Sequence, residues 1–296
     1  QRPKQIGTDQ MPFDLIHTHK IDAATLTLEE VHQACPAAFT KHASPATSER
    51  YGFVSTSNAI EILGDHGFAP VRAIQKPVRK LSELAYADHM LTFAPTGLSD
   101  PNAQDRAEIV LYNSHNGRSA LKLFAGNFRM ICSNGLVAGE GFEAKARHSK
   151  LTAQGFSDMV IQQAESLPAM MQRIERMKET TLEHEQAIDL AYNAASLRWE
   201  HENDVEGMPN GSFAYNRTVN DMIRPNRFED RGQDLWTLFN TAQEKLIRGG
   251  ARVLSHTKAT RQRGYPTIRK ARAISSLPES IRINRQLWDL AEKVAA

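Results

Sequence analysis

Residues 109–136 have a pattern that is typical of a β-hairpin, and this stretch constrains the fold more than any other. An apolar run from Ile109 to Tyr112 suits a half-buried strand. Asn116-Gly117 follows it, and this pair favours a tight turn because both residues tolerate positive φ. Ser133-Asn134-Gly135 then ends the unit. The pattern therefore predicts a pair of antiparallel strands at the centre of the fold.

Side chains on the returning strand are expected to alternate between two faces, since successive residues of a strand point in opposite directions. One predicted face is apolar and the other is basic with one aromatic ring. The first comprises Ser119, Leu121, Leu123 and Ala125, and the second comprises Arg118, Ala120, Lys122 and Phe124. Gly126-Asn127 interrupts the pattern, and a bulge, a kink and a new strand are all compatible with the sequence at this point.

The rest of the chain predicts an α+β fold, a small antiparallel sheet packed on helices and followed by long amphipathic helices. Helix starts are expected at the capping box Thr27-Leu28-Glu29-Glu30, at Ser55 and at Asp234, and strands at 68–75 and 89–94. Apolar residues recur at helical spacing from Phe156 to Trp199, with a break expected near Pro168. Residues 203–233 are predicted to be a loop, and Gly249-Gly250 to close the Asp234 helix.

We predict three segments: an N-terminal arm with a short helix at 1–50, an α+β core at 51–150, and a helical region with a basic C-terminal segment at 151–296. The net charge of +2 over 296 residues means that a basic surface must be local. Cys35 and Cys132 are far apart in the sequence, which argues against a disulfide framework or a structural zinc site. Without an apolar signal segment or an 18-residue apolar run, the sequence predicts a cytoplasmic protein with no membrane partner.

Four stretches resemble the phage/plasmid-like proteins of domain-of-unknown-function family 932. They are YGFVSTSNAIEILGDHGFAPV, NSHNGRSALKLFAGNFRMICSNGLVAG, LWTLFNTAQEKLIRGG and INRQLWDLAEK, and the resemblance extends from about Tyr51 to the C-terminus. The family has no assigned chemistry. The resemblance implies an association with mobile genetic elements and the bacterial cytoplasm.

Motifs of nucleotide and metal chemistry are weak. Gly139 to Ala144 fits G-x-G-x-x-A but lacks the βαβ context of a dinucleotide site, and no Walker motif exists. His17 and His19 have no third ligand nearby in the sequence, so we predict no metal and no cofactor. One enzymatic alternative stays open: a metal-dependent nuclease that uses Glu200, Glu202 and Asp204.

Basic residues interleaved with aromatics favour binding to single-stranded DNA, which proteins hold by cations on the phosphates and aromatic rings under the bases. The strongest local charge asymmetry lies between Arg248 and Arg285. The predicted DNA-binding residues are Arg72, Lys76, Arg79, Lys80, Arg118, Lys122, Phe124, Arg129, Arg261, Arg263, Tyr265, Arg269, Lys270 and Arg272.

The order of helix, strands, hairpin and helix is similar to the core of Rad52-type single-strand annealing proteins. This distant resemblance implies an ATP-independent homo-oligomer, often a ring, that binds single-stranded DNA and pairs complementary strands. We therefore predict a recombination protein of a phage or plasmid without a catalytic site. A third hypothesis is an inhibitor that binds a host defence protein through the methionine-rich helices.

Overall fold

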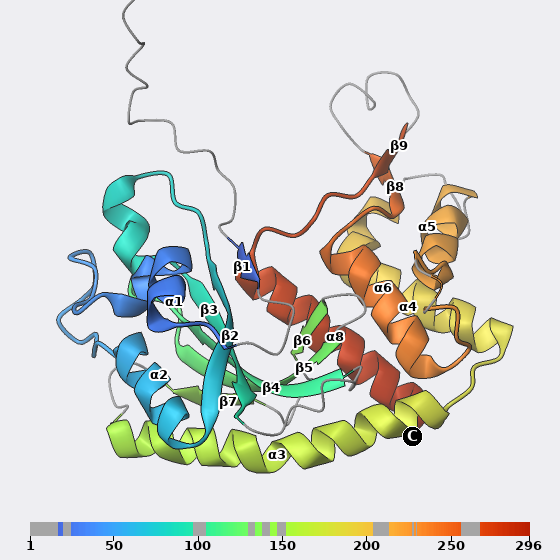
Figure 1. The fold of residues 1–296 in the computed structure, drawn as a ribbon. Coiled ribbons are helices and arrows are strands. Elements are labelled where there is room, and N and C mark those ends of the chain that lie inside the picture. Colours follow the sequence, from blue (N-terminus) through green and yellow to red (C-terminus); the bar gives the residue numbers. More distant parts are fainter. Residues whose placement is uncertain are drawn as a thin grey trace, which may run out of the picture.

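The computed structural model describes residues 17–19, 25–96, 105–129, 134–137, 143–146, 152–203, 213–226, 228, 230–255 and 267–296. It contains a seven-stranded antiparallel sheet, a two-stranded β-ribbon and helices around both (Figure 1). This architecture confirms the α+β prediction. Among the described helices, none combines the length and apolar composition that a bilayer-spanning segment needs.

The large sheet follows the order of the chain. Its path is β1 (His17–His19), β2 (Phe68–Gln75), β3 (His89–Pro95), β4 (Asp105–Asn113), β5 (Leu121–Arg129) and β6 (Asn134–Val137), and β7 (Glu143–Ala146) also pairs with β5. The predicted hairpin is confirmed, because β4 pairs with β5 and Gly117 takes a φ of 77° in the turn between them. Gly126 stays in register opposite Glu108. β5 therefore continues through the position where the sequence allowed a bulge, a kink or a new strand.

Helices cover the first face of the sheet, which carries Leu91, Leu111 and Leu123. These helices are α1 (Leu28–Ala34), α2 (Thr56–Asp65) and the first half of α3 (Ala153–Glu179), with the short 3-10 helices η1 (Pro36–Phe39) and η2 (Leu81–Tyr86) beside them. The predicted capping box at Thr27 and the Ser55 N-cap are both present. α1 buries Val31 and Ala34 in the same core as the sheet.

The predicted helix break near Pro168 is wrong, because α3 runs through Pro168 without interruption. Leu167 and Met170 are buried on either side of the proline. Packing on this face holds the backbone helical although Pro168 donates no hydrogen bond. The break lies further on, at residues 180–183, where Thr181 forms a β-bridge with Asp234.

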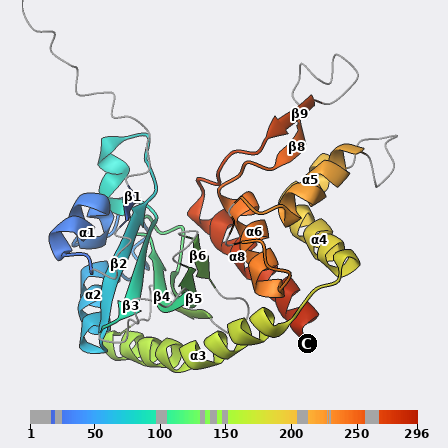
Figure 2. The ribbon, with the colours of Figure 1, turned by 45° about the vertical axis from the view of Figure 1, so that its right-hand side comes forward.

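The C-terminal part is formed by α4 (His184–Asn203), α5 (Phe213–Ile223), α6 (Leu235–Ile247), α8 (Leu277–Ala295) and the ribbon of β8 (Arg252–Ser255) and β9 (Thr267–Lys270). Asp234 caps α6, and Gly249 and Gly250 follow it with positive φ, as predicted. The loop prediction for 203–233 missed α5, and the prediction of a helical C-terminal region missed the ribbon. Figures 1 and 2 show the ribbon projecting from the helices on the side opposite α3.

A buried polar network joins α2 to the sheet. Thr56, His89, Asn113 and His115 have no exposed surface. His89 Nδ1 lies 2.9 Å from the Ala87 carbonyl and therefore donates to it. In the neutral ring, His89 Nε2 then accepts from the Thr56 hydroxyl at 2.9 Å, while Asn113 Nδ2 donates to the same hydroxyl oxygen at 2.9 Å. The one hydroxyl of α2 therefore satisfies groups from two strands, β3 and β4, and we assign this network a structural role.

We expect Thr56→Val to lower the free energy of unfolding by about 2 kcal/mol, because it leaves buried donors and acceptors of His89 and Asn113 unsatisfied. Thr56→Ser keeps the hydroxyl and removes one methyl group, so its loss should be about 1 kcal/mol. Urea denaturation of both variants measures the difference. Equal stability of the valine variant and the parent protein would show that the hydroxyl is not the centre of the network.

Candidate nucleic-acid interface

The second face of the sheet carries Arg72 and Arg106 with the carboxylate of Glu108, and Arg248 lies close enough to act on Arg72. We call these four residues the arginine cluster. Arg106 Nη2 and Nε donate to Glu108 Oε1 at 2.7 and 3.2 Å. Arg72 on β2 is opposite Thr92 on β3, and Thr92 is opposite Val110 on β4. Because alternate residues of β4 share a face, Glu108 and Arg106 lie on the same side as Val110. The register thus gathers residues that are far apart in the sequence.

Burial and the neighbouring charges both shift pKa values in the arginine cluster. The Glu108 side chain is 1% exposed and the Arg106 side chain 15% exposed. Burial raises the pKa of the Glu108 carboxyl, and the Arg72 and Arg106 guanidiniums act against this rise. Burial also lowers the pKa of Arg72; Glu108 opposes that shift, and the charges on Arg106 and Arg248 add to it. Glu108 therefore interacts with the guanidiniums of both Arg72 and Arg106.

Arg248 connects the sheet face to the C-terminal segment. It follows the last turn of α6, and the next residues run beside 271–274, with Gly250 N donating to Ala271 O at 2.8 Å and Ile274 N donating to Ile247 O at 2.8 Å. The Arg272 carbonyl accepts from Arg198 Nη2 at 2.6 Å, which fixes the backbone there. Arg248 and Arg272 are both exposed. These two adjacent segments, 247–250 and 271–274, therefore place Arg248 and Arg272 at the start of the β-ribbon.

The ribbon continues this cationic surface. Lys270 is opposite Arg252, and Arg269 is opposite Val253. Arg252 Nη2 and Nε bond the Asp221 carboxylate at 2.6 and 3.0 Å, which ties β8 to α5. Within the described part of the chain, Lys270 and Arg272 make no ion pair, and both are exposed. We call the set of Arg252, Arg269, Lys270 and Arg272 the cationic ribbon.

Phe124 does not face solvent, which corrects the prediction that this ring lies on an exposed basic face. It is fully buried with Val110 and Tyr112 beneath Leu277 and Ile281 of α8. The alternation itself is present, but α8 covers this part of the second face. A buried ring cannot stack on a base, so Phe124 is a core residue in this structure.

Lys122 lies beside Phe124 and is paired. Its Nζ is 3.2 Å from a Glu143 oxygen and 5.8 Å from the centroid of the Phe124 ring. Arg285 of α8 binds the other oxygen of Glu143, so two cations again share one carboxylate. Lys122 and Arg285 thus link the sheet to α8 through the carboxylate of Glu143.

The remaining predicted residues divide into two groups. Lys76 lies 3.4 Å from Asp88, Arg79 and Lys80 are exposed before η2, and Arg118 is exposed in the hairpin turn. The structure does not bring this group to the cationic ribbon. The other group lies outside the described residues or side chains, and it consists of Arg129, whose backbone belongs to β5, and of Arg261, Arg263 and Tyr265.

Comparison with known proteins gives the family. The family model of the domain of unknown function DUF932 matches residues 44–288. The chain belongs to the DUF932 family. Two relatives from Escherichia coli (strain K12), the UPF0380 proteins YfjQ and YafZ, are each 30% identical to it over 270 residues, which cover 90% of this chain and 90% of each relative. No solved structure matches the chain. These matches confirm the resemblance found in the sequence.

Carboxylates for the nuclease alternative cannot be placed in this DUF932 chain. The side chains of Glu200 and Glu202 and the whole of Asp204 lie outside what the structure describes, as do those of His17 and His19. In the described ranges, no three His, Cys, Asp or Glu side chains form a group that could hold a metal ion. The nuclease hypothesis stays a prediction.

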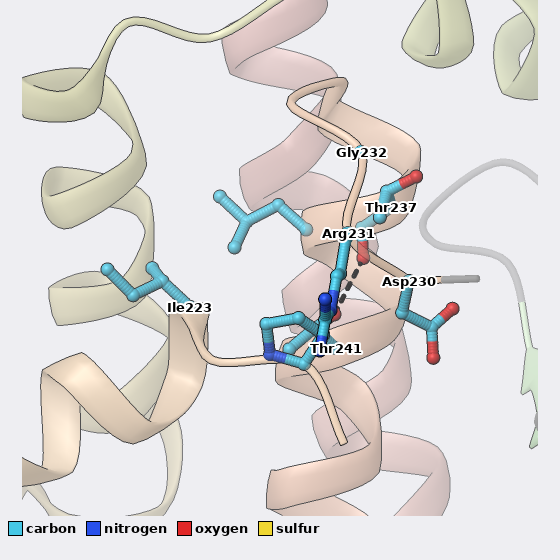
Figure 3. Close-up of a pocket in the computed structure, with 8 residues that line it drawn as sticks. Ile223, Asp230, Arg231, Gly232, Thr237 and Thr241 are labelled. Carbon is cyan, nitrogen blue, oxygen red and sulfur yellow. Dashed lines mark hydrogen bonds between the residues drawn. The ribbon is translucent and has the colours of Figure 1, made fainter. Parts of the chain in front are cut away.

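A pocket of about 350 Å³ lies between the end of α5 and the start of α6 (Figure 3). Its lining includes one cation, Arg231, and one carboxylate, Asp230. Its threonine hydroxyls are used internally, because Thr241 donates to the Thr237 carbonyl at 3.0 Å and Thr237 donates to Asp234 at 2.7 Å. With balanced charges and occupied hydroxyls, this pocket does not extend the cationic surface.

Proposed function

We propose that this DUF932 protein binds single-stranded DNA on the cationic ribbon and the arginine cluster, and that a homo-oligomer of it anneals complementary strands without ATP. One observation carries the proposal. Cations from β2, β4, the end of α6 and β9 lie on neighbouring segments, although they are up to about 200 positions apart in the sequence. Phosphates are the usual partner of such a surface, because each contact releases a counterion from the nucleic acid.

The ribbon offers contacts for bases as well as for phosphates. Ile268 lies between Thr267 and Arg269 on β9 and is 42% exposed. An exposed apolar side chain beside a cation suits unpaired bases, whose faces are apolar. A two-stranded ribbon also fits the major groove of a duplex, so the experiment must compare both forms of DNA.

Fluorescence anisotropy with a labelled 30-nucleotide single strand tests the binding. We expect Lys270→Glu together with Arg272→Glu to lower the affinity about tenfold at 50 mM salt, because two phosphate contacts become repulsive. The slope of log affinity against log salt should become shallower by about 1.4, since each lost contact on a single strand contributes about 0.7. Fluorescence transfer between complementary labelled strands, without nucleotide, tests the annealing.

Lys41→Glu with Arg50→Glu is the matched control. Both residues are exposed and lie between η1 and α2 in the chain. Figure 2 shows α1 and α2 at the opposite side of the molecule from the β-ribbon. The control makes the same change in net charge, so it should leave the salt slope unchanged. Equal losses in the two double variants, or tighter binding to a duplex of the same sequence, would contradict the proposal.

A further inference from the structure

Phe228 is the most exposed aromatic side chain that the structure describes, with 75% of its surface accessible. It lies in the segment between α5 and α6. Surfaces that hold single-stranded DNA usually include aromatic rings on which bases stack. Phe124 is buried, and Tyr265 lies outside the described residues. Within the described part of the chain, Phe228 is therefore the ring that is most open to a base.

Arg231 connects this ring to the pocket between α5 and α6. Its guanidinium carbon lies 5.1 Å from the centroid of the Phe228 ring, and Arg231 also lines the pocket (Figure 3). The Arg231 amide donates to the Phe228 carbonyl at 3.2 Å, which closes a turn between the two residues. Aromatic rings and guanidinium planes both stack on bases. A flat ligand in the pocket can therefore stack on this pair.

Hydrogen bonds hold the pocket close to the β-ribbon. The Arg252 amide at the start of β8 donates to Asp221 in the last turn of α5 at 2.8 Å, and Ile223, two residues further on, lines the pocket. Lys245 of α6 donates to the side chain of Asn226 at 2.5 Å, which ties the segment after α5 to α6. A DNA strand along the cationic ribbon can therefore place a base in this pocket.

The pocket lining suits a base better than a phosphate. Its volume of about 350 Å³ is at the lower end of the range for small-ligand sites, about 300–1,000 Å³. Ile223, Pro225 and Leu238 supply apolar surface for the face of a ring, while Arg231 and Asp230 carry opposite charges. Balanced charges do not concentrate anions. A neutral ring with apolar faces and polar edges matches this lining.

The two threonine hydroxyls of the pocket can only accept hydrogen bonds from a ligand. A hydroxyl has one donor hydrogen and two acceptor lone pairs. Thr241 donates its hydrogen to the Thr237 carbonyl at 3.0 Å, and Thr237 donates its own to the Asp234 carboxylate at 2.7 Å. Cytosine, adenine and guanine carry an amino group that donates, whereas thymine carries an O4 acceptor and a methyl group. The lining therefore favours a base with an amino group over thymine.

We propose that the pocket between α5 and α6 binds one base of a DNA strand through its amino edge, and that Phe228 and Arg231 stack on that base. This inference rests on the proposed function, since the cationic ribbon would hold the phosphates of the same strand. Phosphate contacts carry no sequence information, so the pocket adds a preference among bases. Cytosine and thymine give the closest comparison, because both are single-ring bases.

Fluorescence anisotropy with labelled 12-nucleotide strands of cytosine or of thymine tests the preference. We expect the cytosine strand to bind about fivefold more tightly, because its amino group gains a hydrogen bond that thymine cannot make. Saturation-transfer NMR with deoxycytidine and with thymidine probes the pocket without the ribbon, since nucleosides carry no phosphate. Deoxycytidine should give the stronger signal.

Phe228→Ala should weaken the binding of both strands about tenfold, because one stacking contact is lost. Phe228→Tyr keeps the ring and should restore the affinity. Leu81→Ala is the matched control, because Leu81 is also an exposed apolar side chain, at 77%. It lies on η2, which is held beside β2 by a bond from Gln75 to the Leu84 carbonyl at 3.0 Å. This control should leave the affinity for both strands unchanged.

Thr241→Val separates base recognition from stacking. It removes one acceptor of the pocket and keeps the shape of the side chain, while the Thr237 carbonyl keeps its partner in the helix backbone. We expect the preference for cytosine to fall from about fivefold to below about twofold. The ribbon variant Lys270→Glu with Arg272→Glu should keep the preference while binding both strands more weakly.

The outcomes separate the two proposals. Equal binding of both strands, with full affinity in Phe228→Ala, would overturn the base pocket and leave the ribbon intact as a DNA surface. A change of oligomeric state in Phe228→Ala, measured by light scattering, would identify the ring as a subunit contact and would also overturn the inference. Deoxycytidine binding without any strand binding would support the pocket and remove the proposed function. Failure of both ligands would remove both.

Discussion

Glu108→Ala is expected to lower the free energy of unfolding by about 3–5 kcal/mol, the largest effect among our predictions. The substitution removes the carboxylate that accepts two hydrogen bonds from Arg106, whose side chain is 15% exposed, and that also acts on Arg72. Breaking a buried pair by removing one partner leaves an uncompensated charge in a medium of low polarity. Thermal unfolding followed by circular dichroism, with denaturant titration at 25 °C, measures the loss.

Glu108→Gln is the control for shape. Its amide oxygen keeps one acceptor for Arg106 while the charge is removed, and burial already favours the neutral form of Glu108 by raising its pKa. We expect this variant to lose less than half of what Glu108→Ala loses. If alanine and glutamine were equally tolerated, the carboxylate would not be the counter-charge that holds the arginines together.

Gly249→Ala has the second largest expected effect, a loss of about 3 kcal/mol. Gly249 has a φ of 82°, which disfavours a side chain. A Cβ built there would also lie 2.7 and 2.8 Å from the carbonyl carbon and oxygen of Arg272, and it would clash with the Ala271 carbonyl. These are backbone atoms, which a side-chain rotation cannot move away, so the segment that carries Arg272 must shift. Under the proposed function, DNA affinity should therefore fall together with stability.

Gly250→Ala provides the matched comparison at the next residue. Gly250 has a φ of 93°, but a Cβ added there meets nothing within 4 Å. This variant has the same conformational penalty of about 1 kcal/mol without the clash. Denaturant titration of both variants isolates the contact with residues 271–272, and equal losses would mean that the close approach is unimportant.

Local signals predicted local structure well. The Asn116-Gly117 turn, the Thr27 capping box and the Asp234 N-cap each depend on neighbouring residues, and each is present. The continuity of α3 through Pro168 was missed because packing against the sheet and α8 is a tertiary effect. The strands β8 and β9 are only four residues long and are separated by a charged stretch, so no hairpin signal identified them.

The candidate site was predicted in part. Charge asymmetry led to Arg269, Lys270 and Arg272, because a run of cations is visible without knowledge of the fold. Arg106 and Arg248 were not among the predicted site residues. They meet Arg72 through strand register and through the position where α6 ends, which no local pattern encodes. Phe124 was misjudged because α8, far along the chain, covers its face of the sheet.

The long helix α3 has a consequence for how much nucleic acid one molecule could occupy. Its 27 residues form an uninterrupted rod of about 40 Å. The rod packs against β4, β5 and β7 and also against α6 and α8 (Figure 1). A brace of this kind fixes the separation between the sheet and α6 and α8, the helices that come before and after the β-ribbon in the chain. The footprint on a strand should therefore be a constant number of nucleotides per subunit, independent of strand length.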